Sequence, residues 1–241
     1  MRIAVVNCNV NAAITTNLES IAAAAVSPGV EILALTPPFG PESAEGYYES
    51  FISAAGMLAA LEQAQEEFDA VVLAGFGEHG REGARQRWEV PVVDITEAGP
   101  ILAKLVSHRY GIVTTLDTTV PAIWESLRNA GLAEHCVGVA ASGIEVSAIH
   151  DDAAQVASTL EREARGLQSS GAEAIVLGCA GFTGLDDALE ERLGIPVIDG
   201  VEAACRVAEL LVRSGLRTSA AGAFRPPRLE KQWVGWQMGS R

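Results

Sequence analysis

The chain is poor in aromatic residues, poor in basic residues and without a long apolar run. Aromatics make up 5% of its 241 residues although 49% are hydrophobic, a profile that favours an α/β protein with buried aliphatic strands over a β-sandwich. Lys and Arg number 17 against 31 Asp and Glu, and the net charge of −14 repels phosphate backbones, so no nucleic-acid partner is expected. No apolar stretch reaches the roughly 18 residues of a membrane span, so no membrane partner is expected either.

The chain also lacks the spacing of disulfide, metal and nucleotide sites. Its four cysteines are widely scattered and form no CxxC motif: Cys8, Cys136, Cys179 and Cys205. The histidines have no metal-ligand spacing, so no metal site is predicted, and no strand is followed by a GxGxxG or GxxxxGKS motif. Because the N-terminal stretch runs directly into an apolar strand without the layout of a signal peptide, we expect a cytoplasmic protein with free thiols.

What the chain does contain is an internal duplication. Three segments of the first half recur in the second half, in the same order and at a nearly constant offset. DAVVLAGFGEHG at 69–80 matches EAIVLGCAGFTG at 173–184, VPVVDITEA at 90–98 matches IPVIDGVEA at 195–203, and RIAVVN at 2–7 is more weakly matched by RYGIVT at 109–114. The duplication predicts two lobes that share one topology.

Strands and helices are expected to alternate in each half. Short β-branched runs typical of buried parallel strands occupy residues 3–6, 31–35, 70–73 and 91–93, and then 111–114, 137–139, 174–177 and 196–198. Ala-rich stretches such as 12–25 and 47–68 are predicted helices. The alternation predicts an α/β fold of two pseudo-symmetric lobes, each a parallel sheet flanked by helices. We assign 1–97 plus 206–241 to lobe 1, with an extended C-terminal tail from residue 217, and 98–205 to lobe 2.

In such sheets ligands bind beyond the carboxyl ends of the strands, so we expect the active site in the cleft between the lobes. LGCAG at 177–181 places Cys179 directly after a buried strand, in a Gly-flanked turn. Backbone N–H groups in such a turn can bind a carboxylate or an enolate, and they lower the pKa of a thiol so that the thiolate is available as a base. At this point a buried structural cysteine is an equally good interpretation of Cys179.

The motifs together resemble the aspartate/glutamate/hydantoin racemase superfamily, most closely its hydantoin and allantoin racemase branch, from residue 2 to about residue 211. The resemblance is carried by VNCNVN, TPPFGPESAEGYYES, AGFGEHGREGARQ, VPVVDITEA, GIVTTLDTTVP, LGCAGF and IPVIDGVEAA, in this order. It implies a two-lobed α/β fold, a small-molecule substrate, no cofactor and a homo-oligomer. In the racemases of this family two cysteines face each other across the α-carbon of the substrate, and Cys179 matches the second of them.

The first cysteine of that pair is missing. The repeat places Gly75 opposite Cys179, where the racemases read ACFG, and Glu78 and His79 replace their usual Asp-Pro. His79 or Glu78 could replace the missing thiol, because an imidazole suits proton transfer near neutral pH, whereas a loop His that caps a helix or faces water is the alternative. Otherwise Cys179 protonates one face only, which resembles the arylmalonate decarboxylases of this superfamily, or Gly75 is an engineered substitution.

Other strand-end loops are candidates for substrate binding. Asn7 and Asn9 follow the first strand and either bind a carbonyl oxygen or shape a turn. Thr114 and Thr115 are their counterparts in the second half, with hydroxyl and backbone donors that can stabilise an enolate. Tyr47 starts a helix in the stretch that lines the side-chain pocket in relatives. The two Gly-rich turns complete the predicted binding set with Gly75, Phe76, Gly77, Ala180 and Gly181.

The sequence therefore predicts a cofactor-independent racemase or isomerase. It moves a proton at the carbon next to a carbonyl of a hydantoin-like or amino-acid-derived substrate, with Cys179 as acid/base. One alternative is a decarboxylase of a small malonate-type acid with one-sided protonation by Cys179, and the other is a non-catalytic small-molecule binder. Cys8 is close to the site by the strand-end argument, and we interpret it as a small apolar filler.

Overall fold

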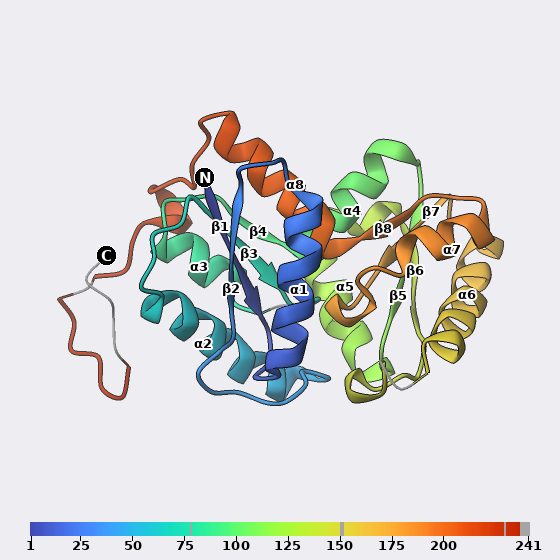
Figure 1. Ribbon diagram of the computed structural model, residues 1–241, viewed down its shortest axis with the longest axis horizontal. Helices are drawn as coiled ribbons and strands as arrows, with labels where there is room; N and C mark the ends of the chain where they lie inside the picture. Colours follow the sequence, from blue (N-terminus) through green and yellow to red (C-terminus); the bar gives the residue numbers. More distant parts are fainter. Residues whose placement is uncertain (78, 150–151, 229, 237–241) are drawn as a thin grey trace.

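The computed structural model describes residues 1–77, 79–149, 152–228 and 230–236 and shows two α/β lobes side by side (Figure 1). Each lobe has one four-stranded sheet with the same order: the second strand in the chain lies at one edge, followed by the first, the third and the fourth. Every neighbouring pair of strands is parallel, as helical crossovers between strands require. The predicted fold of two pseudo-symmetric α/β lobes is confirmed.

The sheet of lobe 1 is formed by β1 (Arg2–Asn7), β2 (Glu31–Leu35), β3 (Ala70–Ala74) and β4 (Val92–Asp94). The helices that connect these strands are α1 (Ala12–Ala25), α2 (Tyr47–Gln63) and α3 (Arg81–Arg87). The strands closely match the predicted runs. The helix predicted over 47–68 ends earlier, because Ala64 leaves the helical region with ψ 130°.

The sheet of lobe 2 is formed by β5 (Tyr110–Thr114), β6 (Cys136–Ala141), β7 (Ala174–Leu177) and β8 (Val197–Asp199). Its helices are α5 (Val120–Asn129), α6 (Ala153–Ser169) and α7 (Asp186–Leu193). Short 3₁₀ turns lie between them: η1 (Asp117–Thr119), η2 (Ala133–His135), η3 (Val146–Ala148) and η4 (Ala180–Phe182). Pro121 lies in the first turn of α5, which its fixed φ suits.

Two helices connect the lobes. α4 (Ile95–Val106) leaves lobe 1 and packs against β7, whereas α8 (Gly200–Arg213) leaves lobe 2 and packs back against β3 and α1. Figure 1 shows α8 crossing to the sheet of lobe 1. Both helices begin at an Asp that ends a strand, and the two helices also pack against each other. The division of the chain after residues 97 and 205 stays a prediction, and both boundaries lie inside these connecting helices.

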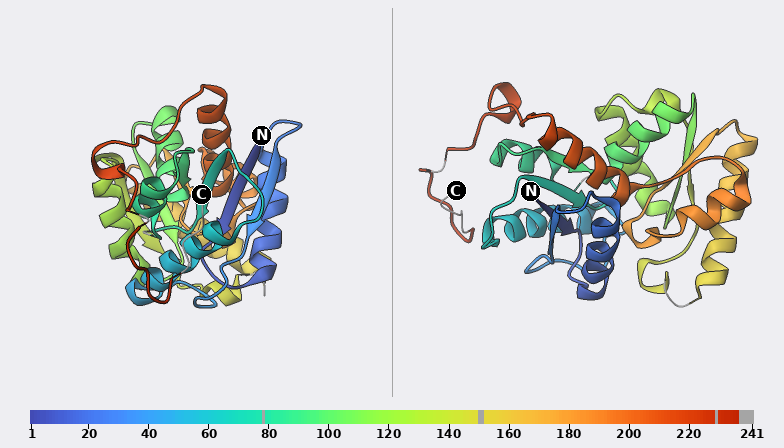
Figure 2. Two further views of the ribbon diagram at one scale, coloured as in Figure 1. Left: turned by 90° about the vertical axis from the view of Figure 1, so that its left-hand side faces the viewer. Right: turned by 45° about the horizontal axis from the view of Figure 1, so that its top comes forward.

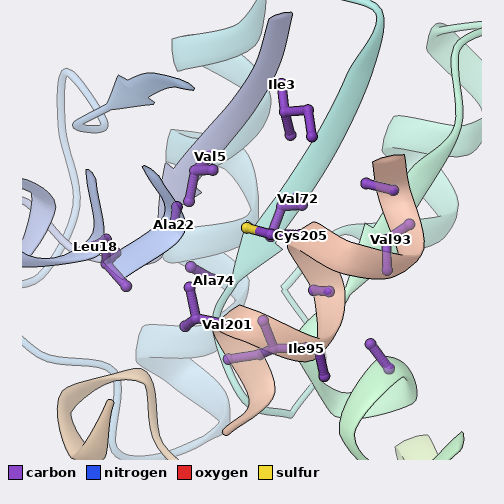
Figure 3. Close-up of a cluster of buried hydrophobic side chains, with 14 of the residues drawn as sticks. Ile3, Val5, Leu18, Ala22, Val72, Ala74, Val93, Ile95, Val201 and Cys205 are labelled. Carbon is purple, nitrogen blue, oxygen red and sulfur yellow. The ribbon is translucent and has the colours of Figure 1, made fainter. Parts of the chain in front are cut away.

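The connecting helices share a hydrophobic core with the sheet of lobe 1. Ile3 and Val5 of β1 and Val72 of β3 point towards Val201 and Cys205 of α8 (Figure 3), and all five are at most 5% exposed. Because a helix covers each face of the sheet, its strands are apolar along their whole length and do not alternate with polar residues. This packing fixes how the strand ends of lobe 1 face those of lobe 2.

After α8 the chain runs along lobe 1 and forms only the short turn η5 (Gly222–Phe224) within the described part of the tail (Figure 2). Thr218 attaches the start of the tail, because its N–H donates to Glu89 O and its hydroxyl to Val90 O. Trp233 and Trp236 line a surface recess together with Phe39 and Gln63 of lobe 1. None of the described helices is long and apolar enough to cross a membrane.

Candidate functional site

A small cavity lies where the strand ends of the two sheets meet. Residues at the ends of β1 and β3 line it from lobe 1, and residues at the ends of β5 and β7 line it from lobe 2. Its volume is about 30 Å³, which is room for roughly one water molecule. The cavity is therefore at the carboxyl ends of the parallel strands, between the lobes, where the duplication placed the cleft.

The structure brings most of the predicted residues to this cavity: Asn7, Asn9, Phe76, His79, Thr114, Thr115, Cys179, Ala180 and Gly181. Gly75 and Gly77 belong to the same loop as Phe76. Tyr47 lies elsewhere, at the first turn of α2, where it is 39% exposed and its ring contacts Phe51 at a centroid distance of 6.3 Å. Glu78 is outside the described residues. The roles assigned to all these residues stay predictions.

Cys179 comes directly after β7 and its Gly178. A Cβ on Gly178 would lie 2.7 Å from Cγ2 of Ile112 and 2.9 Å from the carbonyl oxygen of Val113. Only glycine fits there, and its N–H donates to that same carbonyl at 2.7 Å. The close approach of β5 and β7 places Cys179 at the cavity. Cys179 is the N-cap residue of η4, and its Sγ accepts a hydrogen bond from Gly181 N at 3.3 Å.

The pKa of the Cys179 thiol differs from the sequence expectation. Burial raises this pKa to about 11, although the N–H groups of Gly181 and Phe182 lower it, and the nearby carboxylate of Glu45 raises it further. We expected the N–H groups to dominate, and that expectation was wrong, because desolvation of the thiolate outweighs two backbone hydrogen bonds. In this state Cys179 is a protonated thiol at neutral pH and can donate a proton.

His79 follows the β3 loop in lobe 1 and is almost fully enclosed. It is 3% exposed, and neither ring nitrogen has a hydrogen-bond partner among the described residues. Burial, partly offset by the backbone of Gly75, lowers the pKa of this imidazole to about 4. The ring is therefore neutral at pH 7, with two polar atoms available at the cavity.

In each lobe one polar residue holds the loop together and the next one is available to a ligand. Asn7 Nδ2 donates to Asn9 Oδ1, Asn11 O and Thr15 Oγ1 at 3.0–3.1 Å, so Asn7 shapes the turn after β1. The Nδ2 group of Asn9 has no acceptor among the described residues.

The loop after β5 repeats this arrangement. Thr114 Oγ1 donates to the carbonyl oxygen of Gly178 at 3.0 Å and also contacts the hydroxyl of Thr119. The hydroxyl of Thr115 has no partner within the described part of the chain, although Thr115 lines the cavity. Asn9 and Thr115 are therefore the two side-chain donors that a bound carbonyl oxygen could engage.

The segment before α2 closes the cavity from the side. Ala44 lines it, and Glu45 connects the lobes: its carbonyl oxygen accepts from Thr118 Oγ1, and its Oε1 accepts from Val146 N at 2.8 Å. Pockets for organic ligands usually enclose several hundred Å³, far more than this cavity does. In this structure the contacts of Glu45 with lobe 2 therefore close one side of a cavity that is smaller than an organic ring.

Sequence reasoning missed several residues of the cavity: Ile14, Ala44, Thr119, Val146 and Gly178. Cys8 was set aside as a small apolar filler, and its side chain does pack beside the apolar cluster of lobe 1. Cys8 also lines the cavity, as its position one residue beyond β1 predicted. Ala44 and Val146 carry no chemical signal of their own, because they reach the site only through the fold.

Comparisons with known proteins support the fold. The sequence model described as Asp/Glu/Hydantoin racemase matches residues 3–208. The solved structure of an allantoin racemase from Pseudomonas fluorescens is 46% identical with a TM-score of 0.95, covering 98% of this chain and 100% of that one. The solved structure of an allantoin racemase from Klebsiella pneumoniae is 37% identical with a TM-score of 0.92, and the match covers 98% of this chain and 97% of that one. A hydantoin racemase from Paenarthrobacter aurescens is 36% identical over 97% of this chain and 100% of its own length.

Proposed function

The chain belongs to the Asp/Glu/hydantoin racemase family, and from that premise we propose that it inverts the configuration at the carbon next to a carbonyl in a hydantoin-like ring, without a cofactor. The observation that carries the proposal is Cys179 at the cavity between the lobes. The similarity to allantoin and hydantoin racemases over nearly the whole chain supports the substrate class.

The reaction needs a base at the ring carbon and donors at the carbonyl oxygen. Removal of the ring proton leaves an enolate, and hydrogen-bond donors placed at its oxygen stabilise the charge that develops in the transition state. The thiolate form of Cys179 is the base on one face. The unengaged Nδ2 of Asn9 and hydroxyl of Thr115 support a role for these residues in binding the carbonyl oxygen.

Inversion also needs a proton donor on the opposite face, which lobe 1 must supply. His79 is buried and lines the cavity from lobe 1, and this position supports its place in the proton transfer. Glu78 keeps its predicted role as an alternative.

A test uses single enantiomers of allantoin and of a 5-substituted hydantoin in deuterated water, with an enzyme-free blank. We expect optical rotation to decay and deuterium to enter at the ring carbon. We expect Cys179→Ala to lose at least a hundredfold in rate, because a positioned acid/base typically contributes 10²–10⁴-fold. Cys136→Ala is the matched control, since Cys136 is also buried but lies away from the cavity. Absence of both rotation loss and exchange in the unmutated protein would contradict the proposal.

A malonate decarboxylase is the second candidate, and Gly75, which presents no side chain opposite Cys179, favours it. The fold is similar to that of an arylmalonate decarboxylase at 19% identity and a TM-score of 0.58, a similarity that concerns the fold alone. Incubation with a disubstituted malonic acid decides between the two. The racemase proposal predicts no release of CO₂, whereas a decarboxylase releases CO₂ and forms one enantiomer of the product.

Assembly into a homo-oligomer also remains a proposal. The exposed apolar side chains of α2 support it, because Tyr48 and Phe51 are 81% and 65% exposed and solvent-exposed aromatic clusters often mark interfaces. Light scattering on the purified protein would give the number of subunits, and a monomeric mass would contradict this proposal.

A further inference from the structure

We infer that the buried guanidinium of Arg81 is a clamp between the lobes. It holds α5 of lobe 2 against lobe 1 and, through Asp94 and Thr96, it also holds the loop after β3 that lines the cavity. Arg81 is thus a positioning residue, which sets the distance between the two walls of the cavity without touching the substrate. Its effect on turnover rests on the proposed racemase function, whereas the clamp itself can be tested without any substrate.

Arg81 is a charged side chain in the interior of the molecule. It lies in the first turn of α3 and is 1% exposed, and its guanidinium stays protonated. A buried charge is unfavourable unless charged or polar groups surround it. Nε lies 2.8 Å from Oε1 of Glu82 and 3.4 Å from Oε1 of Glu97, and Nη1 lies 4.0 Å from Oδ1 of Asp94. These three carboxylates fix the position of the guanidinium from the side of lobe 1.

The same guanidinium reaches lobe 2. Its Nη1 donates to Oγ of Ser126 at 3.2 Å, and Ser126 is a 2% exposed residue of α5. The turn η1, directly before α5, also contacts lobe 1, because the hydroxyl of Thr118 donates to the carbonyl oxygen of Glu45. The segment formed by η1 and α5 is therefore a part of lobe 2 that docks on lobe 1, and the bond to Ser126 lies in the buried part of this contact.

The network continues from Arg81 into the loop after β3. Oδ1 of Asp94, which lies 4.0 Å from Nη1 of Arg81, accepts from Thr96 N at 2.6 Å. The hydroxyl of Thr96 accepts from Gly77 N at 2.8 Å and donates to Gly77 O at 3.1 Å. The same loop carries Phe76, which lines the cavity. One chain of polar contacts thus runs from α5 of lobe 2 to the lobe 1 wall of the cavity.

This network is better suited to fix geometry than to add stability. A buried ion pair contributes little net stability, because the cost of removing two charges from water offsets much of their attraction. A planar guanidinium, in contrast, fixes the direction of each of its partners. The cavity lies between the lobes, so a contact that joins α5 to lobe 1 sets the distance between its walls. A misplacement of about 1 Å in an active site can lower a rate about 10²-fold.

The experiment loosens the clamp from lobe 2 and measures how easily a small reagent reaches the cavity. Ser126→Ala removes the acceptor, leaves the lobe 1 partners of Arg81 in place and favours the helix, so this variant should fold. Alkylation by iodoacetamide at pH 8 is followed for each cysteine by mass spectrometry. We expect Cys179 to react about tenfold faster in Ser126→Ala, because the loss of one hydrogen bond to a charged group shifts an equilibrium by about that factor. Cys136 and Cys205, which are buried outside the cavity, should react at unchanged rates.

Two further variants show whether the effect passes through Arg81. Ser158→Ala on α6 is the matched control, because its hydroxyl donates to a backbone carbonyl of its own helix. The double variant Arg81→Met/Asp94→Asn removes both charges of the buried pair and keeps side chains of similar size. It should reproduce the faster alkylation of Cys179. Adding Ser126→Ala to it should produce no further increase, because both changes break the same link.

Turnover is the second measurement. We expect kcat/KM for racemisation to fall at least about tenfold in Ser126→Ala and to stay at the level of the unmutated protein in Ser158→Ala. Unchanged alkylation of Cys179 in Ser126→Ala would overturn the clamp, and so would a parallel increase at Cys136 and Cys205, which indicates general unfolding.

The remaining outcomes separate the clamp from the function. Effects of Ser126→Ala and of the double variant that multiply would overturn the link through Arg81. Faster alkylation of Cys179 with undiminished kcat/KM would overturn the positioning role. Faster alkylation in a protein that neither exchanges the ring proton nor racemises would leave the clamp standing and remove the proposed function.

Discussion

Lobe 1 and lobe 2 share one strand order, yet the side chains that they present to the cavity differ. In lobe 2 the loop after the β7 strand carries Cys179 and the loop after the neighbouring β5 carries Thr115. In lobe 1 the equivalent loops carry Gly75 after β3 and Cys8 after β1. The loops thus keep their places in both lobes while their side chains differ, so the duplicated fold conserves the position of a loop more strictly than the residue within it.

A thiol placed in the β3 loop of lobe 1 would produce the largest effect. We expect Gly75→Cys alone to impair activity at least tenfold and to lower the melting temperature, because its Cβ would lie 2.7 Å from Cβ of Cys8 and 2.9 Å from His79 Nδ1. The double variant Cys8→Gly/Gly75→Cys removes the first of these contacts and should recover activity above the level of Gly75→Cys. Equal activity of Gly75→Cys and the double variant would contradict a steric conflict with Cys8.

The Cys179 thiol also predicts a pH dependence. Burial raises its pKa to about 11. The base must be a thiolate, whose fraction increases about tenfold per pH unit below its pKa. We therefore expect kcat/KM to rise between pH 7 and pH 10, after subtraction of the enzyme-free rate.

The pH profile also tests the role of His79. His79→Ala should lower kcat by roughly 10²-fold if His79 takes part in the proton transfer, and His79→Asn, which does not titrate, should not restore the rate. A flat profile over this range in the unmutated protein would contradict the raised pKa of Cys179. An unchanged kcat of His79→Ala would contradict a role of His79 in the proton transfer.

The smallest effects are expected at the two aspartates that start the connecting helices. Asp199 accepts from Val201 N, Glu202 N and Gly184 N, so Asp199→Ala should reduce the free energy of unfolding by about 1–2 kcal/mol at pH 7.

Asp94 is fully buried and its Oδ2 has no partner among the described residues. Burial raises the pKa of Asp94 to about 7, although Arg81 and Thr96 lower it.

The raised pKa of Asp94 gives the sign of its pH effect. Its stabilising contribution is full below the ordinary pKa of an aspartate and is lost as the pH rises through about 7. Asn keeps an oxygen for Thr96 N and does not ionise. In denaturant unfolding, the free energy of unfolding of Asp94→Asn should therefore increase relative to that of the unmutated protein from pH 4 to pH 8. A difference between the two free energies that does not change with pH would contradict a raised pKa of Asp94.

Much of the fold could be predicted because its signals are local. The β-branched runs that form β1 and β3 have no polar interruptions, and the repeat fixes which segments correspond in the two lobes. Cys179 could be predicted for the same reason, since a strand, a glycine and a cysteine follow one another in the chain. The early end of α2 at Gln63 was missed, because the Ala-rich pattern continues past a break that the backbone at Ala64 makes.

The remaining features of the site depend on distances between residues far apart in the chain. The pKa of Cys179 depends on how much solvent the surrounding loops exclude, and no turn motif contains that information. The contacts of Glu45 with Thr118 and Val146 join two lobes, and Tyr47 is directed to the surface by the orientation of α2. None of these follows from a pattern within one segment.

The sequence by itself determined the two lobes, their parallel sheets, the family and the position of Cys179, because hydrophobic periodicity and the repeat act over short stretches of chain. Only the tertiary structure decided which group stands beside Gly75. The pairing of β1 with β3 places Cys8 in the space of a missing side chain, and burial places a neutral His79 next to it. The contacts around Gly75 arise from strand register and close packing, and neither can be read from the order of residues in the chain.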